Sequence, residues 1–278
     1  MNKLLITVIK RLNMFPDAVR HISGITPSIL IPQGTHMTVE LWLWIGTIGM
    51  ALGVVLLFFP MQKNKSVSEQ GDSIAHFLVP MVAMTLYLLM AYGYGSAPRP
   101  SGRIFYYARY IDWSITTPLL LLSLVSGAVK GHVKKRGAMI AGLVISDVYM
   151  IVTGLVAGWT DDPRLKWSFY LLSCLSFVAI YALLWGPFRK LSEKSPEGET
   201  YRKKLPVLSI VWFLYPVVFL VGQQGLRLWS PVVDATLFTS LDLIAKVIYG
   251  LWAVSLVQHT GSVDDELPES GDRLVRNR

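Results

Sequence analysis

Long apolar runs alternate with short polar links along most of the chain. Seven of these runs have about 20 residues each, the length that a helix needs to cross the apolar core of a bilayer. The pattern predicts an all-α membrane protein built as one bundle of seven transmembrane helices. The expected spans are Val39–Phe59, Ala75–Gly95, Ile104–Val129, Met139–Trp159, Trp167–Trp185, Leu205–Gly222 and Val233–Val257.

The composition agrees with this prediction, because 53% of the 278 residues are hydrophobic and 16% are charged. We assign the seven-helix domain to residues 36–259. Residues 1–35 are expected to form either an amphipathic helix on the membrane surface or a signal-like segment. The tail, residues 260–278, is rich in acidic residues, Gly and Ser and is expected to be disordered.

The net charge of +8 is concentrated in alternate links. The positive-inside bias places the N-terminus outside and the C-terminus in the cytoplasm, as in a multi-pass protein of the plasma membrane. Cations confined to alternate links also argue against nucleic-acid binding. The cation-rich segments contain Lys63 and Lys65; Lys130, Lys134, Lys135 and Arg136; Arg189, Lys190, Lys194, Arg202, Lys203 and Lys204; and Arg273, Arg276 and Arg278.

A lysine, Lys246, lies in the middle of the seventh apolar run, and Asp242 precedes it by one helical turn. A charged side chain at this depth costs roughly 2.5–3.5 kcal/mol on insertion scales, so it is expected to have a partner or a function. The spacing places both groups on one helix face. Two interpretations stay open from these residues alone: a buried amine ready to form a Schiff base with a carbonyl cofactor, and a structural ion pair.

Four polar residues of the third span, Arg109, Asp112, Thr116 and Ser123, lie within one narrow stripe of the helix. The stripe suits an ion path. Hydrogen bonds to neighbouring helices would explain Thr116 and Ser123 equally well, but they would not explain Arg109 and Asp112.

These residues resemble the signature of the microbial (type 1) rhodopsins, of the bacteriorhodopsin-like kind. The third span supplies Arg109-Tyr110-Ile111-Asp112-Trp113 and Thr116-Thr117-Pro118, and the seventh supplies Asp242 and Lys246. The likeness extends over all seven spans, from Glu40 to Leu256. Further matches are Val79, Pro80, Tyr87, Asp147, Gly154, Trp212, Tyr215, Pro216 and Phe219.

The resemblance implies an all-trans retinal joined to Lys246 as a protonated Schiff base. It makes Asp112 the primary counter-ion and proton acceptor and Asp242 the second counter-ion. It places Arg109 on the extracellular side of both carboxylates, and a hydrogen bond from Thr116 would tune the acceptor. Tyr87 would bond to Asp242, and Asp147 to Thr117. The side chains implied around the retinal are Trp113, Thr117, Leu120, Met150, Gly154, Ser173, Phe177, Trp212, Tyr215, Pro216 and Phe219.

The chain departs from the pattern of the family's proton pumps at Ser123, where those pumps carry a carboxylic proton donor. The three motif positions here read Asp-Thr-Ser, and a serine cannot act as a carboxylic acid. Reprotonation is therefore expected to be slow, to come from cytoplasmic water, or to use another group. His76 is a candidate for that group, and a packing histidine is the alternative.

The outer side departs as well, because Gln224 and Asp234 stand where bacteriorhodopsin-like pumps have two glutamates. Asp234 would take part in proton release, or it would be an exposed residue at a helix start, where the helix dipole favours a carboxylate.

The residues and the resemblance together favour a light-driven outward proton pump, a transporter rather than an enzyme. A photosensor that signals through a partner is the alternative, because the Asp-Thr-Ser pattern also occurs in a sensory branch. Asp112 argues against chloride pumping, and sodium pumps carry a different motif. Leu120 stands at a position that tunes colour in the family, and the resemblance implies green rather than blue absorption. A carotenoid antenna is doubtful because Tyr170 fills the place of a glycine in antenna-binding relatives. Relatives form trimers or pentamers, which makes a homo-oligomer the expectation.

Overall fold

The structure is a computed structural model that describes residues 33–63, 67–129, 133–195 and 198–265. The expectations for residues 1–32 and for the tail beyond residue 265 lie outside the described residues. The chain divides after Met37 into two compact units, and the second unit, Thr38–Arg278, contains the bundle.

The described residues contain seven helical rods that are long and apolar enough to cross a membrane, which confirms the predicted fold class. The first four rods are α2 (Gln33–Lys63), α3 (Val67–Ala91), α4 (Ala108–Val129) and α5 (Val133–Trp159). The fifth consists of α6 (Pro163–Leu183), a π-helical turn (Leu184–Phe188) and α7 (Arg189–Ser192), and the sixth is α8 (Gly198–Val221). The seventh consists of α9 (Pro231–Leu243), a π-helical turn (Ile244–Ile248) and α10 (Tyr249–Asp265).

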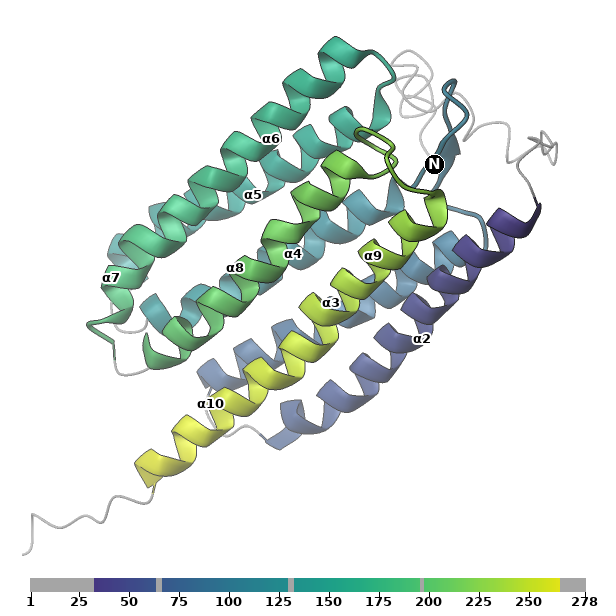
Figure 1. Cartoon of the computed structure of the whole chain (residues 1–278). Helices are drawn as coiled ribbons and strands as arrows, with labels where there is room; N and C mark the ends of the chain where they lie inside the picture. Colours follow the sequence, from purple (N-terminus) through teal and green to yellow (C-terminus); the bar gives the residue numbers. More distant parts are fainter. Residues whose placement is uncertain (1–32, 64–66, 130–132, 196–197, 266–278) are drawn as a thin grey trace, which may run out of the picture. The chain divides into compact units, whose positions relative to one another are not determined.

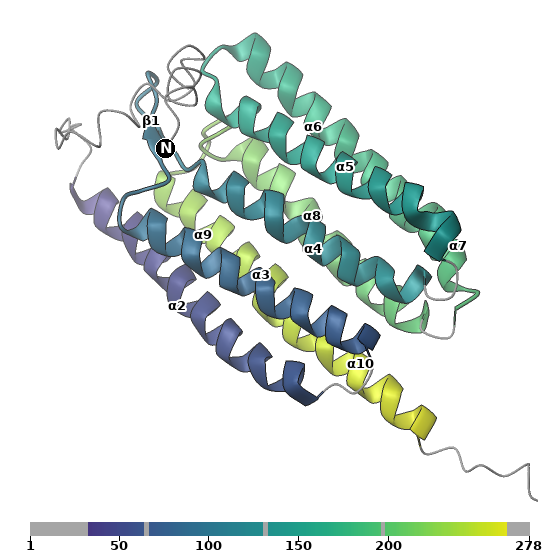
Figure 2. The same cartoon turned by 180° about the vertical axis from the view of Figure 1, so that it is seen from behind.

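A short antiparallel hairpin, which the hydrophobic pattern did not predict, connects α3 to α4. Its strands are β1 (Ala97–Pro98) and β2 (Ile104–Phe105). Figures 1 and 2 show that the hairpin lies at one end of the bundle, whereas α10 emerges at the opposite end. We call these the hairpin end and the tail end. Helix α4 packs against α3, α5 and α8, so its polar stripe lies inside the bundle.

Helices α3 and α8 extend furthest ahead of the predicted spans. Helix α3 begins at Val67 rather than near Ala75, and α8 begins at Gly198 rather than near Leu205. The added turns contain charged residues, and two of these, Asp72 and Lys204, are buried inside the bundle. Lys204 is therefore not a cation of an exposed link, as its position after the fifth apolar run suggested. The last helix also continues to Asp265, past the domain boundary expected at residue 259.

Three glycines of α2 allow this helix to lie close to α3 and to the seventh rod. A β-carbon on Gly46 would come within 2.3 Å of the Tyr87 ring, and one on Gly49 within 2.5 Å of Leu243. Gly53 meets Val247 in the same way, at 2.6 Å. Small residues that permit such close approach are common between membrane helices. The contact at Gly46 holds Tyr87 in position for the site described below.

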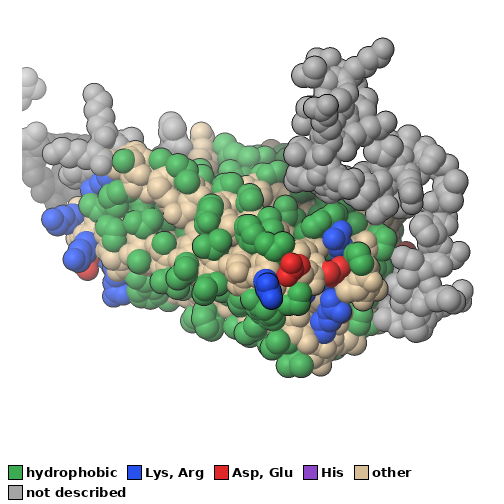
Figure 3. Space-filling view, turned by 90° about the horizontal axis from the view of Figure 1, so that it is seen from above, with side chains coloured by type: hydrophobic (Ala, Val, Ile, Leu, Met, Phe, Trp, Pro, Cys, Tyr) green, Lys and Arg blue, Asp and Glu red, His purple; other side chains and the backbone are tan. Residues whose placement is uncertain are grey.

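Apolar side chains cover the middle of the outer surface. Figure 3 shows one face on which hydrophobic groups occupy the central part, while lysines, arginines and acidic side chains gather toward the two ends. Several large apolar side chains on this outer surface are more than half exposed, among them Leu52, Ile145, Val178 and Ile210. Such a surface would be unfavourable in water and is the surface that lipid tails cover.

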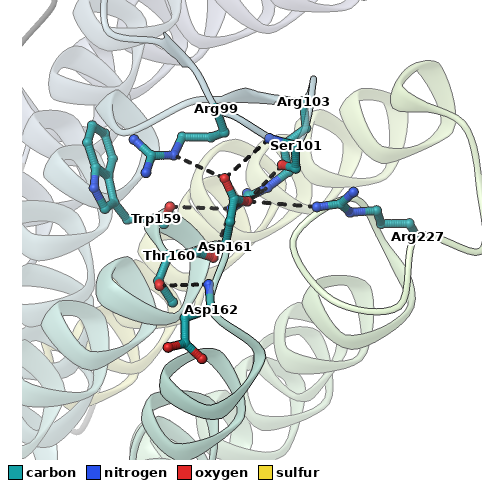
Figure 4. A network of polar contacts seen from close by, with 8 residues as sticks. All are labelled: Arg99, Ser101, Arg103, Trp159, Thr160, Asp161, Asp162 and Arg227. Atoms are coloured by element: carbon teal, nitrogen blue, oxygen red, sulfur yellow. Dashed lines mark hydrogen bonds and ion pairs between the residues drawn. The ribbon is translucent and has the colours of Figure 1, made fainter.

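Asp161 connects three loops at the hairpin end (Figure 4). Its carboxylate accepts a hydrogen bond of 2.7 Å from the Ser101 hydroxyl and pairs with Arg103 at 3.3 Å and with Arg227 at 3.8 Å. Burial tends to raise the pKa of Asp161, but the hydrogen bond from Ser101 and the charge of Arg103 outweigh it and lower the pKa below 3.8. The folded state is therefore stabilised by the ionised carboxylate.

We expect Asp161→Asn to lower the melting temperature of the detergent-solubilised protein by about 2–6 °C at neutral pH, because charged hydrogen bonds contribute about 1.5–3 kcal/mol. A group whose pKa is lowered on folding stabilises above its unfolded pKa and loses this effect as the pH falls. The difference in melting temperature between the wild type and Asp161→Asn should hence vanish as the pH falls below 3.8, the ordinary pKa of an aspartate. Glu199→Gln, at an exposed pair with Lys203, is the control and should change little. An equal melting temperature at neutral pH would contradict the role of Asp161.

Candidate functional site

Lys246 lies at the centre of the bundle with 2% of its surface exposed. Its Nζ donates a hydrogen bond to Oδ2 of Asp112 on α4 and lies 3.2 Å from Oδ1 of Asp242 on α9. Both carboxylates are as buried as the lysine. A single cation thus lies between two acids. The spacing of Asp242 and Lys246 predicted the first of these pairs, and the depth of Asp112 in the third span indicated that this acid has a partner or a function.

Asp242 is held by hydrogen bonds from three other rods. The Tyr87 hydroxyl of α3 donates to Oδ2 at 2.7 Å, which confirms the bond expected from the sequence. The Tyr215 hydroxyl of α8 donates to Oδ1 at 2.8 Å, and the Trp113 indole of α4 donates to the same oxygen at 3.3 Å. These three donors fix the position of the Asp242 carboxylate.

Asp112 is held much less firmly. Its second oxygen, Oδ1, is buried and has no hydrogen-bond partner among the described residues. Thr116 lies one turn further along α4, as expected, but in this conformation its hydroxyl donates at 2.9 Å to the main-chain carbonyl of Asp112. The two carboxylates beside Lys246 are therefore unequal, and Asp112 retains more capacity to accept a proton.

The backbone around Lys246 is not a regular α-helix. Residues Ile244–Ile248 form a π-helical turn with Lys246 at its centre. Such turns are rare and are frequently found at functional sites. The wider turn separates α9, which carries Asp242, from α10.

A cavity begins beside Lys246 and is bounded by α4, α5, α6 and α8. About 810 Å³ of space between the lining atoms is empty, and part of this space is open to the surroundings. The lining includes the side chains expected from the sequence, namely Trp113, Thr117, Leu120, Met150, Gly154, Ser173, Phe177, Trp212, Tyr215, Pro216 and Phe219. It also includes residues that we did not predict, namely Tyr110, Ile151, Tyr170, Cys174 and Ala245.

Hydrogen bonds fix two parts of the cavity wall. The Thr117 hydroxyl donates to Asp147 at 2.7 Å, which confirms the expected bond, and it also lies 2.7 Å from the carbonyl of Trp113. The Tyr170 hydroxyl donates to the carbonyl of Pro216 at 3.0 Å, and its ring stacks on Phe219. Gly154 lies on the same wall, and a β-carbon at this position would make an ordinary contact of 3.4 Å with the Ser173 hydroxyl.

Arg109 lies on the hairpin side of the central site and is buried. Its ion pair is with Asp234, at 3.8 Å, and its guanidinium lies 4.6 Å from the centre of the Phe238 ring. Asp234 lies in the first turn of α9, as the helix-start alternative expected, but it is 4% exposed and accepts a hydrogen bond of 2.9 Å from the main-chain N–H of Gln223, so the expected exposure is wrong. Gln224 is also buried, and its side-chain oxygen has no partner among the described residues.

A second polar cluster lies on the tail side of Lys246. The Ser123 hydroxyl donates to Asp72 and lies 3.0 Å from Nε2 of His76, and Lys204 pairs with Asp72 at 2.8 Å. The structure thus brings together Ser123 and His76, which the sequence indicated as site residues, and Asp72 and Lys204, which it did not. The available signal was the spacing of Asp72 and His76, four residues apart on the first turns of α3.

Comparison with known proteins identifies the family. The model of the bacteriorhodopsin-like protein family matches residues 37–260, so the chain belongs to this family. The bacteriorhodopsin of Halobacterium salinarum is 33% identical over 269 residues, covering 94% of this chain and 97% of the relative. Members of the family are light-driven ion pumps and photoreceptors rather than enzymes, and the chain is a multi-pass protein of the plasma membrane.

Solved structures agree with this assignment. The thermophilic rhodopsin from Rubrobacter xylanophilus superposes with a TM-score of 0.77 at 34% identity, covering 82% of this chain and 99% of the other. The light-driven proton pump rhodopsin CsR of Coccomyxa subellipsoidea has a TM-score of 0.71 at 28% identity, covering 79% of this chain and 96% of the other.

The family implies retinal bound to a lysine, and the residues fit this cofactor. A primary amine on Lys246 stands beside an aromatic and aliphatic cavity, as an aldehyde with a long apolar tail requires. Two acids next to the amine would balance the positive charge of a protonated link.

We predict that Gly46→Ala disturbs the central site from outside it. The new methyl group would meet the Tyr87 ring at 2.3 Å, so the ring must move and weaken its bond to Asp242. Overpacking of this kind costs about 1–3 kcal/mol, and the melting temperature should fall by several degrees. The absorption maximum of the pigment should shift as well.

The matched control for this variant is Gly142→Ala, because a β-carbon there meets nothing within 4 Å. It should leave the colour unchanged and keep or slightly raise stability. Wild-type colour and stability in Gly46→Ala would contradict the proposed contact.

Proposed function

We propose that the protein is a light-driven outward proton pump that carries all-trans retinal on Lys246 as a protonated Schiff base. The retinal would supply light absorption and a change of shape that alters the surroundings of the Lys246 nitrogen. The name of the Coccomyxa relative, a light-driven proton pump, supports this proposal. The chain itself supports it through the placement of its acids and bases along one axis.

The unequal holding of Asp112 and Asp242 is the observation that carries the proposal. Three donors hold the Asp242 carboxylate in place, whereas Asp112 has an oxygen without a partner among the described residues. The proton on Nζ of Lys246 would therefore pass to Asp112. Asp242 would remain the second counter-ion.

Release would proceed toward the hairpin end, where Arg109 and Asp234 lie. Arg109 pairs with Asp234 at 3.8 Å, and a positive group between Asp112 and Asp234 can move toward whichever acid is ionised. Once Asp112 has gained a proton, Asp112 would attract Arg109 less, and Arg109 would favour the ionised form of Asp234. The positive-inside bias makes the hairpin end extracellular, so the transport is outward.

Light-driven acidification is the test of this proposal. Cells that produce the protein in unbuffered salt solution should acidify the medium on illumination, and a protonophore should abolish the change. Lys246→Ala, which cannot form the link, should give neither colour nor acidification. An illuminated wild-type pigment that leaves the medium pH unchanged would rule out pumping.

Asp112→Asn should shift absorption to the red and stop transport, because the variant removes a counter-ion and the acceptor together. The expected loss of pumping is at least 100-fold, as for the removal of a general base. Glu199→Gln is the control and should pump normally. Unchanged colour in Asp112→Asn would assign the counter-ion role to another group.

A photosensor that signals through a partner is the second candidate, and the serine at position 123 favours it, since a slow return to the resting state suits signalling. Slow recovery without acidification, together with a transducer that copurifies, would support this function. We further propose that the protein forms a homo-oligomer, which mass measurement in mild detergent would test. The Tyr170 side chain, bonded to Pro216 and stacked on Phe219, argues against a carotenoid antenna at that wall.

A further inference from the structure

The cluster on the tail side of Lys246 contains four side chains from three helices. Asp72 and His76 belong to α3, Ser123 to α4 and Lys204 to α8. Each has at most 6% of its surface exposed. Buried polar groups at this depth are costly unless they pair with one another, so their meeting is specific to the fold.

The contacts form a continuous chain. Lys204 Nζ donates to Asp72 Oδ2 at 2.8 Å, the Ser123 hydroxyl donates to Asp72 Oδ1, and His76 Nε2 lies 3.0 Å from the Ser123 hydroxyl. A carboxylate, a hydroxyl and an imidazole in hydrogen-bond contact can pass a proton from one to the next.

The chain leads toward Lys246. His76 Nδ1 is buried and has no partner among the described residues, and it lies 3.5 Å from the position of a β-carbon on Gly250. Gly250 follows Lys246 by four residues, which is about 6 Å along a helix axis. Two titratable groups lie near His76 among the described residues: the Asp72 carboxylate, 4.0 Å from Nε2, and Tyr249, whose ring centre lies 5.8 Å from that of the imidazole.

The pairing with Lys204 decides what Asp72 can do. A buried carboxylate beside an ammonium group is ionised, because neither charge would otherwise be stable there. Asp72 therefore stores no proton at rest. Asp72 can therefore accept a proton at the tail end of the bundle, where the cation-rich links lie.

We propose that Asp72, through Ser123 and His76, takes a proton from the cytoplasm and returns it to Lys246, in place of the carboxylic donor that position 123 lacks. This inference rests on the proposed pump. The proton binds to Asp72, the Asp72 hydroxyl then donates to Ser123 Oγ, and the Ser123 proton moves to Nε2 of His76. Nδ1 of His76 gives its own proton toward Lys246, and one proton in total is moved.

After this transfer the cluster returns to the arrangement seen in the structure, with Ser123 donating to an ionised Asp72. The imidazole then carries its proton on Nε2 and must regain the other tautomer before the next turnover. The last step, from Nδ1 to Nζ of Lys246, covers more than the helical turn between Gly250 and Lys246, because Nζ lies beside Asp242, and it needs water or a movement of the imidazole.

A relay that takes its proton from the medium makes the rate of pigment recovery depend on pH. Because no proton is stored, recovery of the pigment after a flash should slow as the pH rises, by about tenfold per pH unit where proton uptake limits the rate. A stored carboxylic proton would instead give a recovery that is independent of pH.

The test is flash spectroscopy on the full-length pigment across a series of pH values, combined with pH recording of the medium. Asp72→Asn should slow recovery at least tenfold without a change in resting colour, and Asp72→Glu should restore much of the rate. Ser123→Ala breaks the chain at its middle, should also slow recovery, and keeps the buried ion pair if Asp72→Asn fails to fold. A carboxylic infrared band that appears during recovery should be absent in Asp72→Asn.

Lys204→Met gives a second readout that a structural role would not produce. Without the ammonium group Asp72 should hold a proton at rest, so recovery should lose its pH dependence. Lys203→Met is the matched control, since Lys203 pairs with exposed Glu199 at 2.7 Å and lies beside Lys204 in sequence. It should keep the wild-type pH dependence.

The outcomes separate this inference from the pump. Acidification by the wild type, with wild-type recovery in both Asp72→Asn and Ser123→Ala, overturns the relay and leaves the pump. Slowed recovery in these variants without acidification by the wild type overturns the pump and keeps the path to Lys246. An unchanged pH dependence in Lys204→Met would overturn the part assigned to Lys204.

Discussion

The buried cation of Lys246 is the constraint on which the rest of the site depends. An ammonium group in the middle of a membrane bundle is tolerated when acids lie beside it, and here Asp112 and Asp242 supply them from two different rods. Asp242 in turn is fixed by Tyr87 from α3, by Tyr215 from α8, and by Trp113 from α4, the helix that also carries Asp112. The close approach of α2 at Gly46 then supports Tyr87 from behind. One charge therefore determines where several helices must lie.

This arrangement separates two tasks that one acid could not perform together. In the proposed pump, Asp242, which accepts hydrogen bonds from Tyr87 and Tyr215, would stay in place as the second counter-ion, whereas Asp112, which has one strong contact, would accept the proton. The cavity is predominantly aromatic and aliphatic, which keeps water away and strengthens the electrostatic contrast between the two acids. A bound cofactor would extend from this polar end into the apolar wall.

Much of the fold and of the central site could be predicted from the sequence, because long apolar runs and a lysine within one of them are strong signals. The second cluster could not. Hydropathy ends a span at the first charged residues, which placed Asp72 and Lys204 in links, although the two side chains neutralise each other inside the bundle. A pattern read along one helix does not show that an acid on α3 will meet a lysine on α8. The hairpin and the depth of Asp234 were missed for the same reason, since both depend on contacts between distant segments.

The ion pairs follow the polar stripe of α4 from end to end. Each site combines one buried cation with one or two carboxylates: Arg109 with Asp234, Lys246 with Asp112 and Asp242, and Lys204 with Asp72. Ser123 connects the last pair to His76. Arg109 and Ser123 are separated by 14 residues of the stripe, roughly 21 Å of helix. A proton that leaves one site changes the charge felt by its neighbours, because a low-dielectric interior screens such changes weakly. Movement in one direction then requires that the central site open to one end at a time. In the proposed pump, the difference between the two ends, Arg109 paired with Asp234 at one and Lys204 paired with Asp72 at the other, would supply the asymmetry on which that direction depends.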